Sequence, residues 1–160
     1  MDTVVYPGTF DPITNGHTDL VERASRLFDR VLVAVAASSD KHTAFPLEIR
    51  VSLARDVLAH IGNVEVCSFG NLLVDFMAQQ QARVILRGLR AVSDFEYEFQ
   101  LALMNRRLER HVETVFLMTG FRWIFISSSI IKDAAQHGGD VSGLVPEHVQ
   151  QMLKEKYGLA

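Results

Sequence analysis

A loop after the first apolar run carries three residue types that bind anions. Gly8, Thr9 and His17 lie within the stretch Tyr6 to His17, ahead of a helix that apolar residues predict over 20–28. Glycine lets the backbone approach a ligand closely, threonine offers a hydroxyl, and the first turn of a helix attracts phosphate. The loop therefore indicates a phosphate site that contains an imidazole. Taken alone, it is better explained by turn-forming Pro-Gly and Asp-Pro pairs, with the histidine as a polar first-turn residue.

Two arginines flank a glycine at the end of a later apolar run. The segment Arg87-Gly88-Leu89-Arg90 follows Val84 to Leu86, and Asp94, Glu96 and Glu98 open the helix after it. Guanidinium groups bind phosphate oxygens through paired hydrogen bonds, and glycine lets the backbone approach the ligand. In an arbitrary protein these arginines would instead be neutralised by the nearby carboxylates. Their position after a strand, together with the loop described above, favours phosphate binding.

Hydroxyl groups and one lysine complete the candidate phosphate ligands. The run Ser127 to Ser129 precedes a short helix, so its oxygens can cap that helix. The same geometry receives phosphate oxygens. Lys41 follows the second strand-like run, where it could reach another phosphate, although an isolated loop lysine is more often solvated.

Histidine spacing and cysteine content argue against metal and disulfide chemistry. His60, His111, His137 and His148 lack the spacing of metal ligands, so we expect surface residues and no structural zinc. Cys67 is the single cysteine, which excludes an intramolecular disulfide, and its strand-like surroundings predict a buried, inert thiol.

Charge and hydropathy exclude further classes of protein. The net charge of −3 lacks the basic excess of a nucleic-acid-binding domain, so no nucleic-acid partner is expected. The longest apolar run, Val31 to Ala37, is far shorter than the roughly 20 residues that a membrane-spanning helix needs. The chain opens without a signal-peptide pattern, so we expect a cytoplasmic protein with no membrane partner.

Short β-branched runs that alternate with amphipathic stretches must position these residues. The runs predict five strands, at 4–6, 31–36, 64–67, 84–86 and 115–118. The apolar helical faces between them comprise Leu20, Ala24, Leu27 and Phe28, then Leu47, Val51, Ala54, Leu58 and Ile61, then Leu72, Leu73, Phe76 and Met77. Apolar strands alternating with helices are typical of a parallel sheet covered on both faces. We expect one doubly wound, Rossmann-like α/β domain over residues 1–160, with a five-stranded parallel sheet, a C-terminal helical appendage at 146–157, and ligands at the carboxyl ends of the strands.

Both loops resemble the signatures of known enzymes. The stretch Thr9 to His17 fits the pattern T/S-x-F-D-P-x-T-x-G-H of the nucleotidylyltransferase superfamily, a relative of the class I aminoacyl-tRNA synthetases. A Walker A loop and a dinucleotide-binding glycine fingerprint are absent from the sequence. The stretch Arg87 to Glu98 resembles the pattern R-G-L-R-x-x-x-D-F-E-Y-E of one family within it, the phosphopantetheine adenylyltransferases. The resemblance covers nearly the whole chain.

The resemblance implies adenylyl transfer from ATP to 4′-phosphopantetheine, giving dephospho-coenzyme A and pyrophosphate in coenzyme A biosynthesis. It implies Mg²⁺ carried by ATP, no metal ligands from the protein, and a site that dephospho-coenzyme A or coenzyme A can occupy. The residues that it assigns to ATP are Thr9, Phe10, His17, Gly88, Leu89, Arg90, Glu98, Trp123, Ile124, Phe125, Ile126, Ser127, Ser128 and Ser129. Those assigned to phosphopantetheine are Thr9, Lys41, Leu73 and Arg87, and the catalytic set is His17, Thr9, Lys41 and Arg90.

The sequence departs from the family pattern at a few positions and leaves alternatives open. Ile124 stands where relatives often have serine, and His42 and Thr43 follow Lys41 where many relatives have proline. One alternative is a related enzyme of the same superfamily that accepts nicotinamide mononucleotide, glycerol phosphate or phosphocholine. The Arg87-to-Glu98 stretch argues against it. A nucleotide-binding regulator without turnover is another, and the retained histidine of the first loop argues against it.

The helix after Arg90 predicts an assembly. It carries two apolar stripes, one with Phe95, Phe99, Ala102 and Leu103 and one with Tyr97, Leu101, Met104 and Leu108. A single core needs only one stripe, so the other is a candidate subunit interface or lies under a second helix. Relatives with this signature form hexamers, so we expect a homohexamer.

Overall fold

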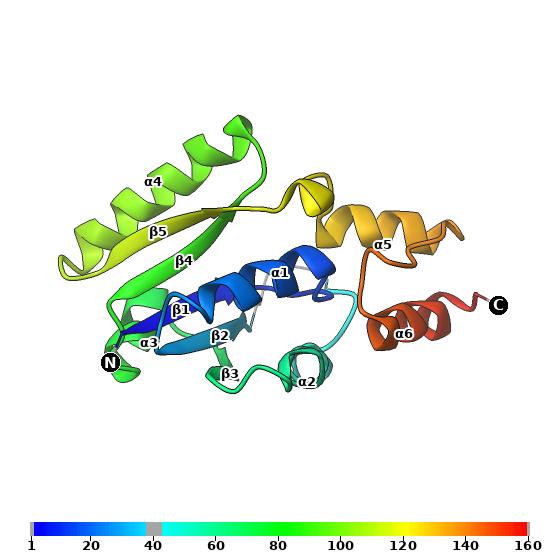
Figure 1. Ribbon diagram of the computed structural model, residues 1–160, viewed down its shortest axis with the longest axis horizontal. Helices are drawn as coiled ribbons and strands as arrows, with labels where there is room; N and C mark the ends of the chain where they lie inside the picture. The colour runs from blue at the N-terminus through cyan, green and yellow to red at the C-terminus, as the bar shows by residue number, and fades with distance from the viewer. Residues whose placement is uncertain (1, 38–42, 160) are drawn as a thin grey trace.

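The computed structural model describes residues 2–37 and 43–159 and contains a five-stranded parallel sheet. The strands are β1 (Thr3–Gly8), β2 (Arg30–Ala36), β3 (Val64–Phe69), β4 (Val84–Leu89) and β5 (Glu113–Met118). Their spatial order is β3-β2-β1-β4-β5 (Figure 1). In β1, Val4 lies opposite Val31 of β2 and opposite Val84 of β4. The predicted strands are all present, and the predicted α/β class is confirmed.

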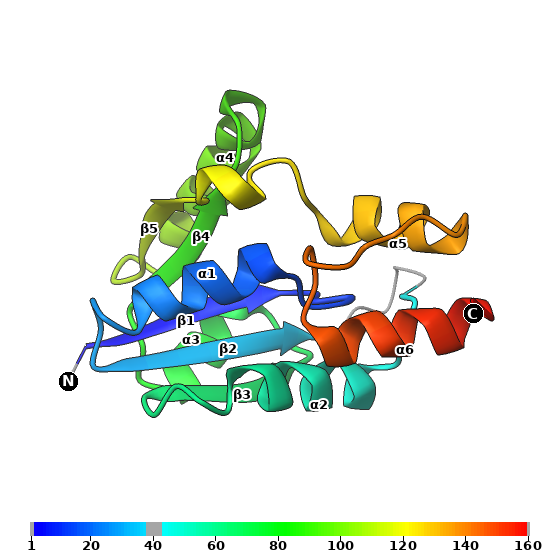
Figure 2. The same ribbon diagram turned by 45° about the vertical axis from the view of Figure 1, so that its right-hand side comes forward.

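The helices connect and cover these strands. They are α1 (Asn15–Ala24), α2 (Leu47–Leu58), α3 (Leu73–Gln79), α4 (Val92–Leu108), the short 3₁₀ helix η1 (Phe121–Trp123), α5 (Ser128–Gln136) and α6 (Glu147–Tyr157). Both views place α5 and α6 beyond the carboxyl ends of β1 and β2, at the end of the molecule opposite the N-terminus (Figure 2). The predicted C-terminal appendage is α6, which Pro146 precedes as the N-cap.

Alternate residues of β1 face two separate hydrophobic clusters. Val4 and Tyr6 belong to the larger cluster, which residues of α1, α2, α5 and α6 complete. Val5 points to the other face, where Phe76 and Met77 of α3 cover it. Successive side chains of a strand point to opposite faces, so helices on both sides are needed to bury a strand that is apolar throughout. The sheet is doubly wound, as the sequence predicts.

The prediction of fully apolar strands is wrong at the edge of the sheet. Strand β3 pairs only with β2, and its Glu65 and Ser68 side chains are exposed. Cys67 is half-buried there instead of buried, and this partial burial raises the pKa of its thiol. An edge strand has a neighbour on one side only, so water reaches residues that a central strand would cover.

The first helix begins earlier and ends earlier than its apolar residues predict. It starts at Asn15, because Thr14 and His17 form a capping box, and Ser25 is the C-cap. The predicted face therefore fails at Leu27, which lies beyond the helix and is 64% exposed. The earlier start places His17 within the first helical turn.

Helix α4 buries neither of its two predicted stripes as a whole. Phe95 and Phe99 of the first stripe are 45% and 47% exposed, and Tyr97 and Met104 of the second are 63% and 57% exposed. Among the α4 residues whose burial the structure describes, 94–108, the buried one is instead Glu98, at 9% exposure. The expectation that one stripe packs on the core is wrong, since the helix turns a narrow and partly polar face to β4 and β5.

Candidate active site

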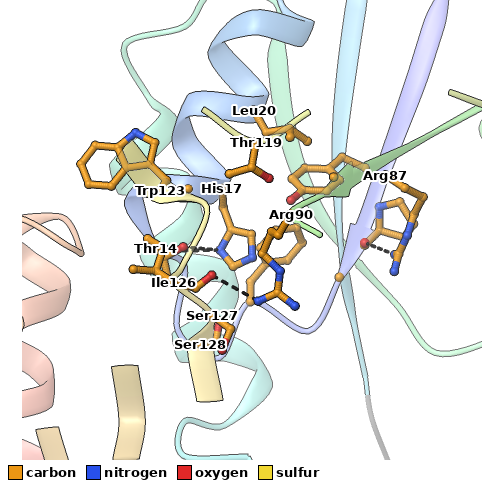
Figure 3. A pocket seen from close by; sticks show the side chains of 16 residues that line it. Thr14, His17, Leu20, Arg87, Arg90, Thr119, Trp123, Ile126, Ser127 and Ser128 are labelled. Atoms are coloured by element: carbon orange, nitrogen blue, oxygen red, sulfur yellow. Dashed lines mark hydrogen bonds between the residues drawn. The ribbon is translucent and has the colours of Figure 1, made fainter. Parts of the chain in front are cut away.

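The chain order reverses between β1 and β4, which lie side by side in the sheet. Strands β2 and β3 lie on one side of β1, whereas β4 and β5 lie on the other. Loops leaving neighbouring strands in opposite directions open a crevice at the carboxyl ends, where ligands of such sheets bind. A cavity of about 260 Å³ lies at this point (Figure 3). The predicted site residues that line it are Phe10, His17, Arg87, Gly88, Arg90, Trp123, Ile126, Ser127 and Ser128.

The two ring nitrogens of His17 have different roles. Its Nδ1 lies 3.0 Å from the backbone nitrogen of Thr14 and 3.1 Å from the Thr14 hydroxyl (Figure 3). A backbone N–H can only donate, so Nδ1 is an acceptor and the neutral ring carries its proton on Nε2. The second nitrogen is therefore a hydrogen-bond donor available to a ligand in the cavity.

Burial keeps this imidazole neutral. The ring lies deep among protein atoms although the cavity leaves part of it accessible, and this burial, aided by the charge of Arg90, lowers the pKa of His17 from 6.5 to about 4. A neutral donor suits an oxygen that gains negative charge during a reaction. It does not suit a general base, because protonation of the buried ring is unfavourable.

Aromatic packing holds the imidazole in place. The Phe10 ring meets the His17 ring edge to face, with centroids 5.1 Å apart, and Tyr6 packs on Phe10 at 5.3 Å. Phe10 adopts a positive φ of 47°. A Cβ at Gly8 would lie 3.0 Å from that ring. The first glycine of the loop is thus needed for close packing of the aromatic group that supports His17.

Each arginine of the predicted pair binds a carboxylate in addition to lining the cavity. Arg90 donates to Asp94 at 3.1 Å and to the Ile126 carbonyl oxygen at 3.2 Å, which joins β4 to the start of α5. Arg87 forms a bidentate pair with Glu98, with both N–O distances at 2.6 Å. Burial, the largest single influence, opposes the charge of Arg87, but the hydrogen bonds and the negative charge of Glu98, with smaller contributions from Tyr6 and Tyr97, together raise its pKa. The acidic residues therefore neutralise the arginines in part, and Arg87 must share or exchange its carboxylate to bind a ligand.

Two smaller groups of predicted residues meet in neighbouring cavities. Thr9, Ser128 and Ser129 line a cavity of about 420 Å³ that also borders Phe10 and His17. A third cavity, of about 200 Å³, is lined by Leu73, Arg87 and Glu98. The two sets of assigned residues are therefore not separated: Arg87 lines the main cavity as well, and Glu98, assigned to ATP, lies beside Leu73 and Arg87.

Four predicted residues lie outside this description of the site. Leu89, Ile124 and Phe125 line none of the three cavities, and the Phe125 side chain is 59% exposed. Lys41 lies outside the residues that the structure describes, as does its neighbour His42. The backbone of Leu89, Ile124 and Phe125 can still contact a ligand, because these residues belong to segments that flank the cavity.

Sequence reasoning missed a buried arginine that shapes the site. Arg50 of α2 is 2% exposed and donates to the carbonyl oxygens of Thr9, Ala36 and Phe45, at 2.6, 3.0 and 3.1 Å. It therefore connects the end of β2 and the segment before α2 to the loop that follows β1. An arginine on an amphipathic helix normally indicates an exposed position, so the sequence carries no signal for this role.

Comparison with known proteins identifies the family. The cytidylyltransferase-like family model matches residues 5–134. A phosphopantetheine adenylyltransferase of Nitratidesulfovibrio vulgaris is 59% identical over 96% of this chain and 83% of its own length. Those of Oleidesulfovibrio alaskensis and Desulfosudis oleivorans are 56% and 54% identical, over 96% and 99% of this chain and 91% and 94% of their own. The chain belongs to the phosphopantetheine adenylyltransferase family.

The likeness extends to a solved structure outside this family. A proposed nicotinate-nucleotide adenylyltransferase from Vibrio parahaemolyticus superposes with a TM-score of 0.70, over 97% of this chain and 93% of its own, at 17% sequence identity. At that identity the comparison shows the fold alone. This chain therefore shares its doubly wound scaffold with that protein.

Proposed function

We propose that the protein transfers the adenylyl group of ATP to 4′-phosphopantetheine and releases pyrophosphate, forming dephospho-coenzyme A. The observation that carries the proposal is the 54–59% identity, over nearly the full chain, to relatives named for this reaction. The site geometry supports it, because a neutral donor, two arginines and a serine-capped helix surround one cavity.

The reaction requires positioning and charge stabilisation more than proton transfer. An acceptor phosphate oxygen forms a bond to the α-phosphorus of ATP, and the bond from that phosphorus to the bridging oxygen breaks. The acceptor is already anionic, so no general base is needed. The Nε2–H of His17 donates to a non-bridging oxygen of the α-phosphate as charge builds there. Arg87 and Lys41 bind the acceptor phosphate, and Ser127 to Ser129 with Arg90 bind ATP.

Magnesium fits this site as part of the nucleotide substrate. Among residues 2–37 and 43–159, no group of three or more potential metal-ligating side chains gathers. The site carboxylates Asp11, Asp94 and Glu98 each bind a basic side chain. The ion would neutralise phosphate charge on ATP and would bind to the protein as part of the ATP complex.

We also propose that the protein is a cytoplasmic homohexamer. The exposed apolar side chains of α4 support an interface, since a surface helix with this many large apolar groups needs cover. No helix in the described part of the chain is long and apolar enough to cross a bilayer. Light scattering at micromolar concentration tests the assembly, and a monomer would refute it.

A coupled assay for pyrophosphate tests the reaction. Purified protein with Mg²⁺ and ATP should release pyrophosphate when 4′-phosphopantetheine is added and not with nicotinamide mononucleotide. Equal turnover with the mononucleotide would overturn the acceptor assignment. ATP binding without pyrophosphate release with any acceptor would instead indicate a regulator.

A further inference from the structure

The buried guanidinium of Arg50 joins three backbone segments beside the site. Its Nη1 donates to the carbonyl oxygens of Thr9 at 2.6 Å and Ala36 at 3.0 Å, and its Nε donates to that of Phe45 at 3.1 Å. Burial lowers the pKa of Arg50, and nearby carboxylates oppose this shift only in part. These hydrogen bonds all go to neutral oxygens, so no ion pair among them offsets the cost of burying the charge.

The bond to Thr9 restrains an unusual backbone conformation at the next residue. The carbonyl oxygen of Thr9 and the backbone nitrogen of Phe10 belong to one rigid peptide plane. Arg50 therefore fixes the orientation of the plane that precedes the N–Cα bond of Phe10. The φ angle about that bond is 47°, in the left-handed region that residues other than glycine seldom adopt. Such a conformation persists only where the surrounding structure holds it, and the guanidinium supplies one of these restraints.

The conformation of Phe10 in turn determines how the imidazole of His17 is held. Phe10 is 3% exposed, and its ring meets the His17 ring edge to face, with the centroids 5.1 Å apart. The contact of Nδ1 with Thr14 fixes one point of the imidazole, but the ring can still tilt about that point. The Phe10 ring restricts this tilt, which sets the direction of the Nε2–H.

We propose that Arg50 is a positioning residue for adenylyl transfer, acting through the Thr9–Phe10 peptide and the Phe10 ring on the Nε2–H of His17. Arg50 itself does not line either of the two cavities that border His17, so it acts on the geometry of the donor. A misplacement of about 1 Å can slow an enzymatic reaction about 10²-fold. The inference rests on the proposed role of His17 as a donor but not on the identity of the acceptor.

An NMR titration of His17 in the free protein tests the link without any substrate. Arg50→Lys is preferred to Arg50→Met because it keeps the charge and part of the hydrogen bonding, but an ammonium cannot reproduce the fork of a guanidinium. In Arg50→Lys the pKa of His17 should rise from about 4 toward 6.5, since a ring that packs less tightly is less desolvated. The positive charge is retained, so the rise reports on packing.

Single-turnover rates at saturating ATP and 4′-phosphopantetheine give the second readout. Arg50→Lys should slow turnover roughly 10- to 100-fold and change ATP affinity less than about 3-fold, because the groups that would bind ATP all remain. Arg55→Lys is the matched control, on an exposed arginine of the same helix that donates to the Val66 carbonyl oxygen. Gly139→Ala, whose added Cβ meets a backbone oxygen, controls for a loss of stability alone. Both controls should keep the wild-type rate within about 2-fold.

A double-mutant cycle tests the route through Phe10. Phe10→Leu removes the ring and leaves the hydrogen bonds of Arg50 in place, so it should reproduce both the slower turnover and the raised pKa of His17. If Arg50 acts through Phe10, the combination of Arg50→Lys with Phe10→Leu should be no slower than the slower single variant. Losses of rate that multiply would show that Arg50 acts by another route and would overturn the inference.

The two readouts also separate this inference from the proposed function. A wild-type rate in folded Arg50→Lys, or a slower rate with an unchanged pKa of His17, would overturn the positioning role. A raised pKa of His17 in a protein that does not use phosphopantetheine would support the link from Arg50 to His17 and count against the proposed acceptor alone.

Discussion

Substitutions of His17 can separate its two nitrogens. Nδ1 accepts the backbone N–H of Thr14, and Nε2 donates into the cavity. In His17→Asn the amide oxygen takes the place of Nδ1, but no donor reaches the cavity. In His17→Gln the amide nitrogen lies near the place of Nε2, but Thr14 loses its acceptor. The two variants therefore remove one function each, and His17→Ala removes both.

The structure sets the expected size of each loss. Loss of one preorganised donor costs about 10²- to 10³-fold in rate, so His17→Asn should slow turnover by that factor with a small change in stability. Thr14 is 2% exposed, and an unpaired buried N–H costs about 1–3 kcal/mol. His17→Gln should therefore be less stable by that amount yet turn over faster than His17→Asn.

The lowered pKa of His17 adds a pH dependence with a definite sign. Between pH 6.5 and about 4 the unfolded chain binds a proton that the native ring excludes, so stability falls as the pH falls through this window. The difference between the pKa values of the unfolded and folded states corresponds to up to about 3 kcal/mol of folding free energy. This stability is fully present above pH 6.5 and is lost near pH 4. Both amide variants lack this titration, so their stability should fall less on acidification.

Two measurements test these effects. Single-turnover rates at saturating ATP and 4′-phosphopantetheine measure the loss of turnover, and urea unfolding at neutral and acidic pH measures the loss of stability. The wild-type rate should not follow a His17 titration at neutral pH, because the ring is already neutral there. His17→Asn with a near wild-type rate would show that the residue only caps α1. A wild-type rate that titrates near pH 6.5, with no recovery in His17→Gln, would instead make His17 a general base.

Other substitutions test the scaffold and the acceptor side. Gly139→Ala places a Cβ 2.9 Å from the backbone oxygen of Ala134 and should destabilise the protein by about 1–3 kcal/mol in urea unfolding, whereas Gly62→Ala, with nothing within 4 Å, should change little. Arg50→Met leaves the carbonyl groups of Thr9, Ala36 and Phe45 unpaired and should lower the free energy of unfolding by more than about 3 kcal/mol; a smaller loss would mean that water replaces the guanidinium. Arg87→Ala should raise the KM for phosphopantetheine more than that for ATP in steady-state assays, and the opposite order would exchange the assigned roles.

The sequence by itself determined the class of fold and the place of the site. Five β-branched runs alternate with amphipathic stretches, and local periodicity predicts such elements because it records which residues avoid water. The loop Thr9 to His17 follows β1, and the stretch Arg87 to Arg90 lies at the carboxyl end of β4, so a parallel sheet had to bring them to one edge. The apolar spacing did not predict the ends of α1, which begins at Asn15 after the N-cap Thr14 and ends at Ala24 with Ser25 as the C-cap.

Only the tertiary structure decided how the site side chains pair. The pairing of Lys132 with Asp11 spans 121 residues, and no local pattern distinguishes that partner from other carboxylates. The same holds for Arg50, whose acceptors are backbone oxygens that any sequence supplies. The protonated nitrogen of His17 follows from one contact with Thr14, which exists only once the helix has its observed start. Periodicity shows which faces avoid water, whereas the partners of charged and polar groups depend on distances that the folded chain alone defines.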